Sequence, residues 1–431
     1  MIVTQLHPAA IAQGLRRHLL SGSLRMSERQ TMLKSYTGEG IRRSVNKYFP
    51  REASEQSPFM EQRITRKLID GRFIAYKERP QRTADEAYLD KSGELDHTML
   101  ELDRLTGLLG TAALLRRYDS DLQELVSDVI TTFEPIWLEG NADPAGIAYP
   151  LAGAHAEADD QLWAVWTQAN HFLCTRNGEV IPIEGNEELE NPYGVLPVVW
   201  SHLMADTAGW WRRMATDIDN AQTSFNVIGT QLMLGALFQS LGQPVASGVD
   251  DRDQLVIGPY NLWKLPQEAR FDFATPSSDL TRIIQIQRWI VESAAYANHM
   301  TIKWADTAGA TSGEHQRILE VELTEAVMGD FSRLRKVERE RFFIDREILS
   351  TQGISVSEEY HIDFTEPHIP LTPEQERGEW EWKWANGLAT KADWFRQYDP
   401  DRTPSDIREQ LLEESPPTSP LTKLLERNPN A

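Results

Sequence analysis

The sequence contains little cysteine and no long apolar run, and each shortage excludes a class of protein. Cys174 is the single cysteine among 431 residues, so no internal disulfide can form and a cysteine-built metal site is disfavoured. No apolar run approaches the ~20 residues needed to cross a bilayer, and the N-terminus lacks the apolar segment of a signal peptide. We therefore expect no membrane partner and a protein made in a reducing cytoplasm.

Cations are also scarce. Lys and Arg total 44 against 65 Asp and Glu, and the net charge of −21 argues against tight binding of nucleic acid over the whole surface. The charge is uneven, because residues 1–80 hold 15 cations and 7 acids, or +8, which leaves −21 − 8 = −29 for the remainder. Such a basic arm suits packing against acidic copies of the same chain or local contact with a polyanion. A solvated surface is the simpler interpretation of any single arginine.

The common catalytic motifs are missing as well. There is no P-loop, no H-E-x-x-H, no G-x-S-x-G and no Rossmann glycine fingerprint. A metal-like group at 155–160 is explained as well by a solvated acidic turn: its members are His155, Glu157, Asp159 and Asp160. Three aspartates at 250–253 lack the glycine and the distal glutamate of a calcium loop. We predict no cofactor, no metal and no enzymatic activity.

The sequence does contain one very long amphipathic helix behind a loop of small residues. The loop reads TIKWADTAGATSG at 301–313, and Thr311 with Glu314 forms a capping box that can start a helix. No proline occurs from 312 to 350, which predicts a helix roughly 58 Å long. Its apolar stripe consists of Leu319, Leu323, Val327, Phe331, Leu334, Val337 and Phe342.

Helical spacing also appears at 99–115, 122–130, 206–240 and 278–300, and two capped helices are predicted to begin near 390 and 403. Short β-like runs at 139–190 indicate a small antiparallel sheet, and further strands are expected at 191–200, 241–277 and 360–364. The fold class predicted is α+β and mainly helical. The helix at 206–240 carries a heptad-like seam, typical of helices packed along their length, formed by Trp211, Met214, Ile218, Ala221, Phe225, Ile228 and Leu232.

Taken in order, five stretches from about residue 32 onward resemble the portal proteins of tailed bacteriophages. They are SYTGEGIRRSVNKYFP at 35–50, the turn and strand NPYGVLPVV at 191–199, a β-containing insertion between two long helices, ATSGE entering the long helix, and GLATKADWFRQYDPDRTPSDIREQLLEE at 387–414. Their order and spacing carry the resemblance, since no single stretch does.

The resemblance implies a portal fold with wing, stem, clip and crown regions around a central channel. The wing would comprise residues 1–205 and 314–371, the stem helices 206–225 and 277–303, the clip 226–276, and the crown 372–431. Tyr260 and Trp263 would anchor the clip interface. The family's tunnel loop, which faces the DNA, would consist of Trp304, Ala305, Asp306, Thr307, Ala308, Gly309, Ala310, Thr311, Ser312 and Gly313.

The resemblance also implies a function and partners. Twelve copies would form a ring at one capsid vertex of a virion, assembled in the host cytoplasm, and double-stranded DNA would be packaged and ejected through it. The implied partners are other copies of the chain, the terminase motor, a head-completion or tail adaptor and the major capsid protein. Two alternatives stay open: an acidic-site hydrolase using Asp159 and Asp160 or Glu187 and Glu188, and a ring-forming virion protein without a DNA channel.

Overall fold

The structure is a computed structural model that describes residues 1–21, 24–49, 60–151, 161–203, 209–241, 243–247, 270–274, 279–302, 304, 313–365, 373–389 and 394. The chain forms two compact units, one of residues 1–307 and 320–367 and the other of residues 308–319 and 368–431. Helices and sheets are both well represented, so the predicted α+β class is confirmed.

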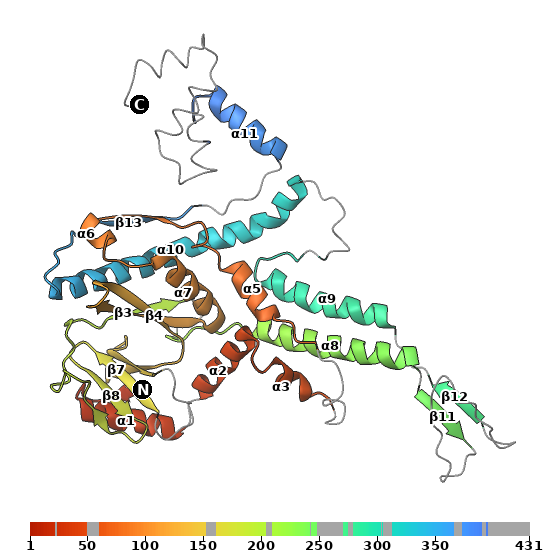
Figure 1. Ribbon diagram of the computed structural model, residues 1–431, viewed down its shortest axis with the longest axis horizontal. Helices are drawn as coiled ribbons and strands as arrows, with labels where there is room; N and C mark the ends of the chain where they lie inside the picture. The colour runs from red at the N-terminus through yellow and green to blue at the C-terminus, as the bar shows by residue number, and fades with distance from the viewer. Residues whose placement is uncertain are drawn as a thin grey trace. The chain divides into compact units, whose positions relative to one another are not determined.

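A six-stranded sheet lies beside the N-terminal helix α1 (Pro8–Ser21) in the first unit (Figure 1). Buried side chains of α1, among them Ile11 and Leu15, pack on Trp163 and Phe172 of the sheet. All neighbouring strands are antiparallel except the first pair, which is parallel. In sheet order the strands are β1 (Ile2–Val3), β5 (Glu134–Leu138), β6 (Gly146–Pro150), β7 (Leu162–Thr167), β8 (His171–Thr175) and β9 (Val180–Ile181). The antiparallel sheet expected at 139–190 is confirmed.

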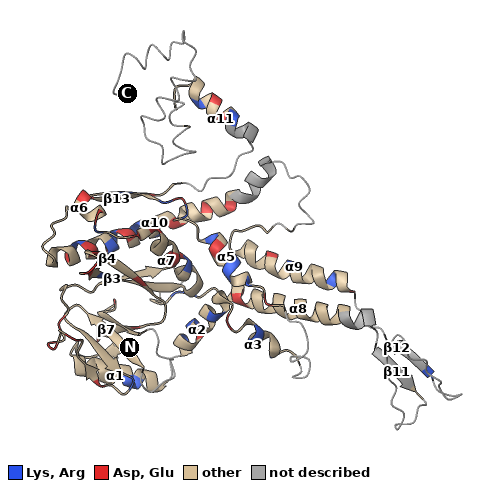
Figure 2. Cartoon of the chain, viewed as in Figure 1, with Lys and Arg blue, Asp and Glu red and all other residues tan. Residues whose placement is uncertain are grey.

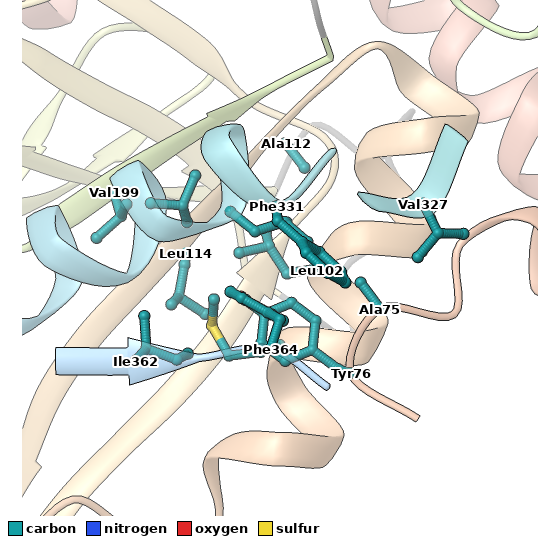
Figure 3. Packing of buried hydrophobic residues seen from close by; sticks show 13 residues of the cluster. Ala75, Tyr76, Leu102, Ala112, Leu114, Val199, Val327, Phe331, Ile362 and Phe364 are labelled. Atoms are coloured by element: carbon teal, nitrogen blue, oxygen red, sulfur yellow. The ribbon is translucent and has the colours of Figure 1, made fainter. Parts of the chain in front are cut away.

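A second sheet, of three strands, supports the long helix. Its order is β10 (Val198–His202), β3 (Thr111–Asp119) and β4 (Glu124–Ile130). The strand expected in 191–200 is therefore present as β10. The long helix α10 (Gly313–Thr351) has 39 residues and matches the prediction closely. Between helix and sheet lies the largest apolar cluster, where Phe331 stacks on Phe364 beside Tyr76 and Leu114 (Figure 3).

Shorter elements complete this unit. The expected strand at 360–364 is β13 (Tyr360–Asp363), which pairs with β2 (Gln81–Ala84). The basic N-terminal part is helical, as predicted. After α1, its helices are α2 (Leu24–Thr37), α3 (Ile41–Asn46) and α5 (Ile64–Arg72). They are followed in the chain by α6 (Glu86–Leu89) and α7 (Leu95–Leu109).

Two long helices form a hairpin that extends from this unit (Figure 1). They are α8 (Thr216–Leu241) and α9 (Leu280–Ala297), and between them β11 (Gln243–Ser247) pairs antiparallel with β12 (Arg270–Ala274). The helix predicted over 278–300 and the strands predicted within 241–277 are therefore present. Residues 248–269 lie outside the described part of the chain, and with them Tyr260 and Trp263.

Two predictions of helix were wrong. Helix α7 ends at Gly110, whose φ of 73° suits glycine, and the chain continues as β3 instead of staying helical to 115. The run 122–130 forms β4. Six successive residues of β3 are buried, which removes the polar alternation that identifies a strand. In addition, α8 begins at Thr216, ten residues after the predicted start, and it continues past the stem boundary placed at 225.

The second unit contributes one described helix besides the start of α10. Helix α11 (Pro373–Ala385) was not predicted, and its Lys383 pairs with Glu379 at 2.6 Å and lies 5.1 Å from the Trp380 ring centre. The capped helices expected near 390 and 403 lie outside the described residues except for Trp394.

Candidate functional site: the helical hairpin and its base

The inner face of α8 is buried within the chain itself. Ile218, Ala221 and Phe225 are at most 8% exposed, and the first two belong to an apolar cluster that also contains residues of α5, α7 and α9. Ile228 and Leu232 are half-buried. The predicted seam therefore packs against helices of its own subunit along its first half.

The first two members of that seam lie outside the helix. Trp211 and Met214 precede Thr216, and Trp211 stacks on Phe133 at a ring-centre distance of 5.3 Å. Trp211 and Met214 fit the heptad-like spacing of the seam, but they belong to a tryptophan-rich turn that comes directly before the helix. Trp210 and Trp211 join the apolar cluster between the two sheets, so they fix the start of the hairpin to the sheet body.

A ladder of buried polar side chains runs along α8 beside the apolar seam. Gln222, Asn226 and Thr230 are spaced four residues apart and are at most 2% exposed. Asn226 binds both backbone groups of Gln62: its Oδ1 accepts from the Gln62 N–H at 2.7 Å, and its Nδ2 donates to the Gln62 carbonyl at 2.9 Å. Gln222 accepts from the Thr65 N–H at 2.9 Å, and Thr230 accepts from the Met60 N–H at 3.1 Å.

The ladder satisfies backbone groups of residues 60–63 and of the first turn of α5, which would otherwise be left without partners. Gly229 lets this segment come close, because a Cβ at that position would collide with the Met60 sulfur. From α9, Gln287 donates to the Phe225 carbonyl at 2.9 Å, which joins the two hairpin helices. Sequence analysis missed these residues, although polar side chains at i, i+4 and i+8 inside an apolar helix were a visible signal.

One side of α9 exposes three large apolar side chains, with Glu292 between the second and the third. Ile286, Trp289 and Tyr296 are 45%, 65% and 72% exposed, and their spacing of three and seven residues places them on one side of the helix. Val291 and Ala294, on the opposite side, are buried. Few charges interrupt this surface, since α9 carries only Arg282, Arg288 and Glu292 (Figure 2). We call Ile286, Trp289 and Tyr296 the outer face.

Trp304 holds the chain to α9 where the predicted tunnel loop begins. Its indole Nε1 donates to Glu292 Oε1 at 2.6 Å, and the Arg288 guanidinium lies 5.2 Å from its ring centre. Trp304 also lines a hollow of about 270 Å³ with Met60, Leu68 and Phe225. Gly313 is the first residue of α10. The other predicted loop residues, Ala305, Asp306, Thr307, Ala308, Gly309, Ala310, Thr311 and Ser312, lie outside the described part of the chain.

Buried charges fix α10 to the body. Glu338, Arg341 and Asp345 are fully buried on one helix face, and Arg341 donates to Glu338 at 2.7 Å and to Asp345 at 2.6 Å. Arg82 donates to Glu338 at 2.8 Å, and Arg116 donates to Asp345 at 2.6 Å. Burial alone would raise the pKa of Glu338, but Arg341 and Arg82 outweigh it and lower that pKa to about 2.

Of the carboxylates proposed for hydrolysis, the described pair Glu187 and Glu188 does not line one cleft. Glu187 and Glu188 are exposed, and Glu188 is the one carboxylate among the described residues that line a nearby hollow of about 430 Å³. Acid–base hydrolysis by two carboxylates needs both at the same cleft. Asp159 and Asp160 lie outside the described residues.

In the described ranges no group of three His, Cys, Asp or Glu side chains is placed to hold a metal ion. Of the helices with described residues, none combines the length and apolarity needed to cross a bilayer.

Comparison with known proteins finds similarity only among solved structures. Neither a protein-family model nor a curated protein matches the chain. One similar structure, "Virion of native gene transfer agent (GTA) particle", has 13% identity and a TM-score of 0.46 over 86% of this chain and 92% of the other. A second, a native GTA particle neck computed with C12 symmetry, has 12% identity and a TM-score of 0.45 over 86% and 93%. An HK97-family phage portal protein from Corynebacterium diphtheriae has 8% identity and a TM-score of 0.34 over 78% and 94%.

Proposed function

We propose that this chain is a portal protein, twelve copies of which form a ring at a capsid vertex and surround a channel for double-stranded DNA. Two features support the proposal. The first is the ordered set of sequence stretches that resembles tailed-phage portals. The second is the α8–α9 hairpin, which buries its inner seam inside the subunit and leaves a row of large apolar side chains exposed on α9.

The outer face carries the proposal. Large aromatic side chains at the surface of one helix are typical of protein interfaces, because tryptophan and tyrosine contribute most to binding when they are covered. The inner side of α9 already packs on α8, so the outer face is left for another chain. In a ring of identical subunits that chain is the neighbouring copy, and adjacent hairpins would together form the stem.

The base of the hairpin is attached firmly to the body of the subunit, as expected of a helix pair that forms the stem of a ring. The polar ladder on α8 and the tryptophan-rich turn before it attach the hairpin to the body at several points. Trp304 attaches the end of α9 in the same region. Residues 305–312 join this region to α10, and we place them at the channel as the loop that touches DNA. Asp306, Thr307, Thr311 and Ser312 would then face the duplex, and the lack of cations among them would let DNA slide.

The remaining partners follow from the same arrangement. The hairpin ends at β11 and β12, so the clip would be the tip of the stem, where the terminase motor and later the adaptor dock. The body with α10 would form the wing and contact the major capsid protein, and the C-terminal helices would form the crown. In each of these roles the chain acts as a structural protein and catalyses no reaction.

Electron microscopy of the purified chain, with native mass spectrometry on the same sample, tests the proposal. A ring of about twelve copies with an open channel wider than the ~20 Å duplex is expected. A monomer or dimer at micromolar concentration would contradict the portal assignment. A closed ring without a channel would favour another ring-forming virion protein.

A further inference from the structure

Three cations surround a small hollow where α2, α3 and α8 meet. Lys34, Arg43 and Lys47 are exposed and line a hollow of about 200 Å³, and none of them makes an ion pair with a described residue. The basic residues of α2, α3 and α5 stand out against the weakly charged α8 (Figure 2). We call this feature the cationic hollow.

The lining of the cationic hollow is suited to a carboxylate. Thr31, Ser44 and Thr223 add hydroxyl groups beside the three cations. Two acids also line it, Glu39 and Asp219, and Asp219 already accepts a hydrogen bond from the Ser35 hydroxyl. The volume is below the ~300–1,000 Å³ of pockets that hold small ligands, which favours a protruding side chain as the occupant.

A segment of opposite charge lies elsewhere on the same subunit. Five exposed glutamates follow β8, with no Lys or Arg among residues 179–190, and none of the five makes an ion pair with a described residue. They are Glu179, Glu184, Glu187, Glu188 and Glu190. We call this segment the glutamate loop.

The backbone of the glutamate loop is held in place. Asn186 donates to the Glu190 carbonyl at 2.9 Å and accepts from the Glu190 N–H at 3.1 Å. Asn170 donates to the Leu189 carbonyl at 3.3 Å. These bonds fix the turn before an interface forms, so its backbone loses little freedom on binding.

We propose that the glutamate loop of one copy enters the cationic hollow of the next copy around the ring. The contact rests on the proposed ring and adds to it a second, electrostatic interface beside the outer face of α9. The hollow lies against α8, whereas the loop lies at the β9 edge of the six-stranded sheet, so one subunit presents the two surfaces at different places (Figure 1). Two different surfaces that bind each other give a head-to-tail contact, which closes into a ring.

Charge composition favours a second copy over DNA as the occupant. Every copy supplies carboxylates in excess, since residues outside 1–80 carry a net charge of −29, from −21 − 8. The three cations line a single hollow of about 200 Å³, whereas a protein that binds duplex DNA contacts phosphates in succession along the backbone.

Exchange of charges between the two surfaces tests the contact. One variant carries Arg43→Glu and Lys47→Glu, and the other carries Glu187→Lys and Glu188→Lys. Each variant alone places two like charges against each other at every junction, so it should lower the ring fraction roughly tenfold or more at 0.15 M salt. An equimolar mixture should restore even-numbered rings, in which the two variants alternate, because every junction is again of opposite charge. The chain carrying all four substitutions should also form rings.

Controls separate the contact from folding and from the ring itself. Lys336→Glu with Arg339→Glu changes the net charge by the same amount on the exposed side of α10, and it should assemble like the parent. Circular dichroism melting reports folding, and Arg43→Gln with Lys47→Gln replaces the first variant if that one does not fold.

The outcomes distinguish the contact from the ring. Normal rings from either reversed variant, or no recovery in the mixture, would overturn the contact and leave the ring intact. Normal rings that retain less DNA would assign the hollow to phosphates instead. A parent chain that forms no ring would refute the proposed function and this contact together.

Discussion

The long helix α10 and the α8–α9 hairpin differ in how much of their apolar surface is buried within the subunit. On α10 the described part buries both an apolar stripe and a chain of ion pairs against its own body, with Glu338, Arg341 and Asp345 fully covered. The hairpin buries one side and leaves Trp289 and Tyr296 more than half exposed. The difference separates two tasks: α10 holds the subunit together, and the hairpin is available to hold subunits to one another.

Loss of Arg341 should affect folding most. Arg341→Met would leave Glu338 and Asp345 buried with fewer partners, and breaking a buried ion pair costs about 3–5 kcal/mol. Urea denaturation should show that loss, and much of the chain should be insoluble. Lys336→Met, at an exposed position of the same helix, is the matched control and should cost under about 1 kcal/mol. Equal stability of the two variants would mean that the ion pairs do not hold α10.

Loss of the ladder should have a medium effect on the base of the hairpin. Asn226→Ala removes both hydrogen bonds to Gln62 and leaves two backbone groups without partners, at about 1–3 kcal/mol each in the buried case. Hydrogen exchange should rise at residues 60–65 before it rises elsewhere. Gln231→Ala, on the exposed side of α8, serves as the control. Unchanged exchange at 60–65 would show that the ladder does not hold the segment.

Much of this contrast could be predicted from sequence, but not the part that depends on tertiary partners. The length of α10 and its stripe were visible because one capped, proline-free segment keeps one period. Strand β3 was taken for helix because both of its faces are buried. The buried charges on α10 were not identified, since two of the cations that pair with them, Arg82 and Arg116, are more than 200 residues away in the chain.

The candidate site shows the same limit. The seam on α8 was found, but its partners were not, and sequence alone left open whether they belonged to the same subunit. The ladder was missed because its acceptors and donors bind main-chain groups of a distant segment. The outer face of α9 was missed because Ile286, Trp289 and Tyr296 form a row on the side of the helix away from its buried residues.

Lowering the pH should reduce the free energy of unfolding by less than the two substitutions above. Burial, with Arg117 nearby, lowers the pKa of His171 to about 4, and burial with Arg212 and Lys336 does the same for His202. Both rings stay neutral in the folded protein, while the unfolded chain takes up protons below a pKa near 6.5. Stability is therefore complete above pH ~6.5 and falls between pH ~6.5 and ~4, by on the order of 1 kcal/mol per ring.

Urea midpoints at pH 7.5 and pH 5 check this expectation. His171→Phe keeps the stacking on Trp166 and cannot titrate, so its stability should change less with pH than that of the parent. The same change in stability between pH 7.5 and pH 5 in both proteins would show that His171 does not contribute to the loss of stability in acid.

Shortening the predicted tunnel loop should have the smallest effect on folding and assembly. Deletion of Thr307 to Ala310 changes a connection whose length costs little, so melting and ring formation should stay near the parent. Retention of a full-length genome should fall, because the loop would no longer reach the DNA. Thr307→Lys with Thr311→Lys should slow translocation in a salt-dependent way, since each ring gains phosphate-binding cations. If both variants package and retain DNA normally at low salt, the loop does not line the channel.

The most direct measurement is the native mass of a chain carrying Trp289→Asp and Tyr296→Asp, compared with the parent at the same concentration. Both positions are exposed in the single subunit, so the variant should fold and melt like a parent monomer. Charges placed in a buried interface between copies would prevent assembly. We expect a ring for the parent and a folded monomer for the variant. Assembly of the variant into the same ring as the parent would show that the outer face of α9 is not an interface between copies.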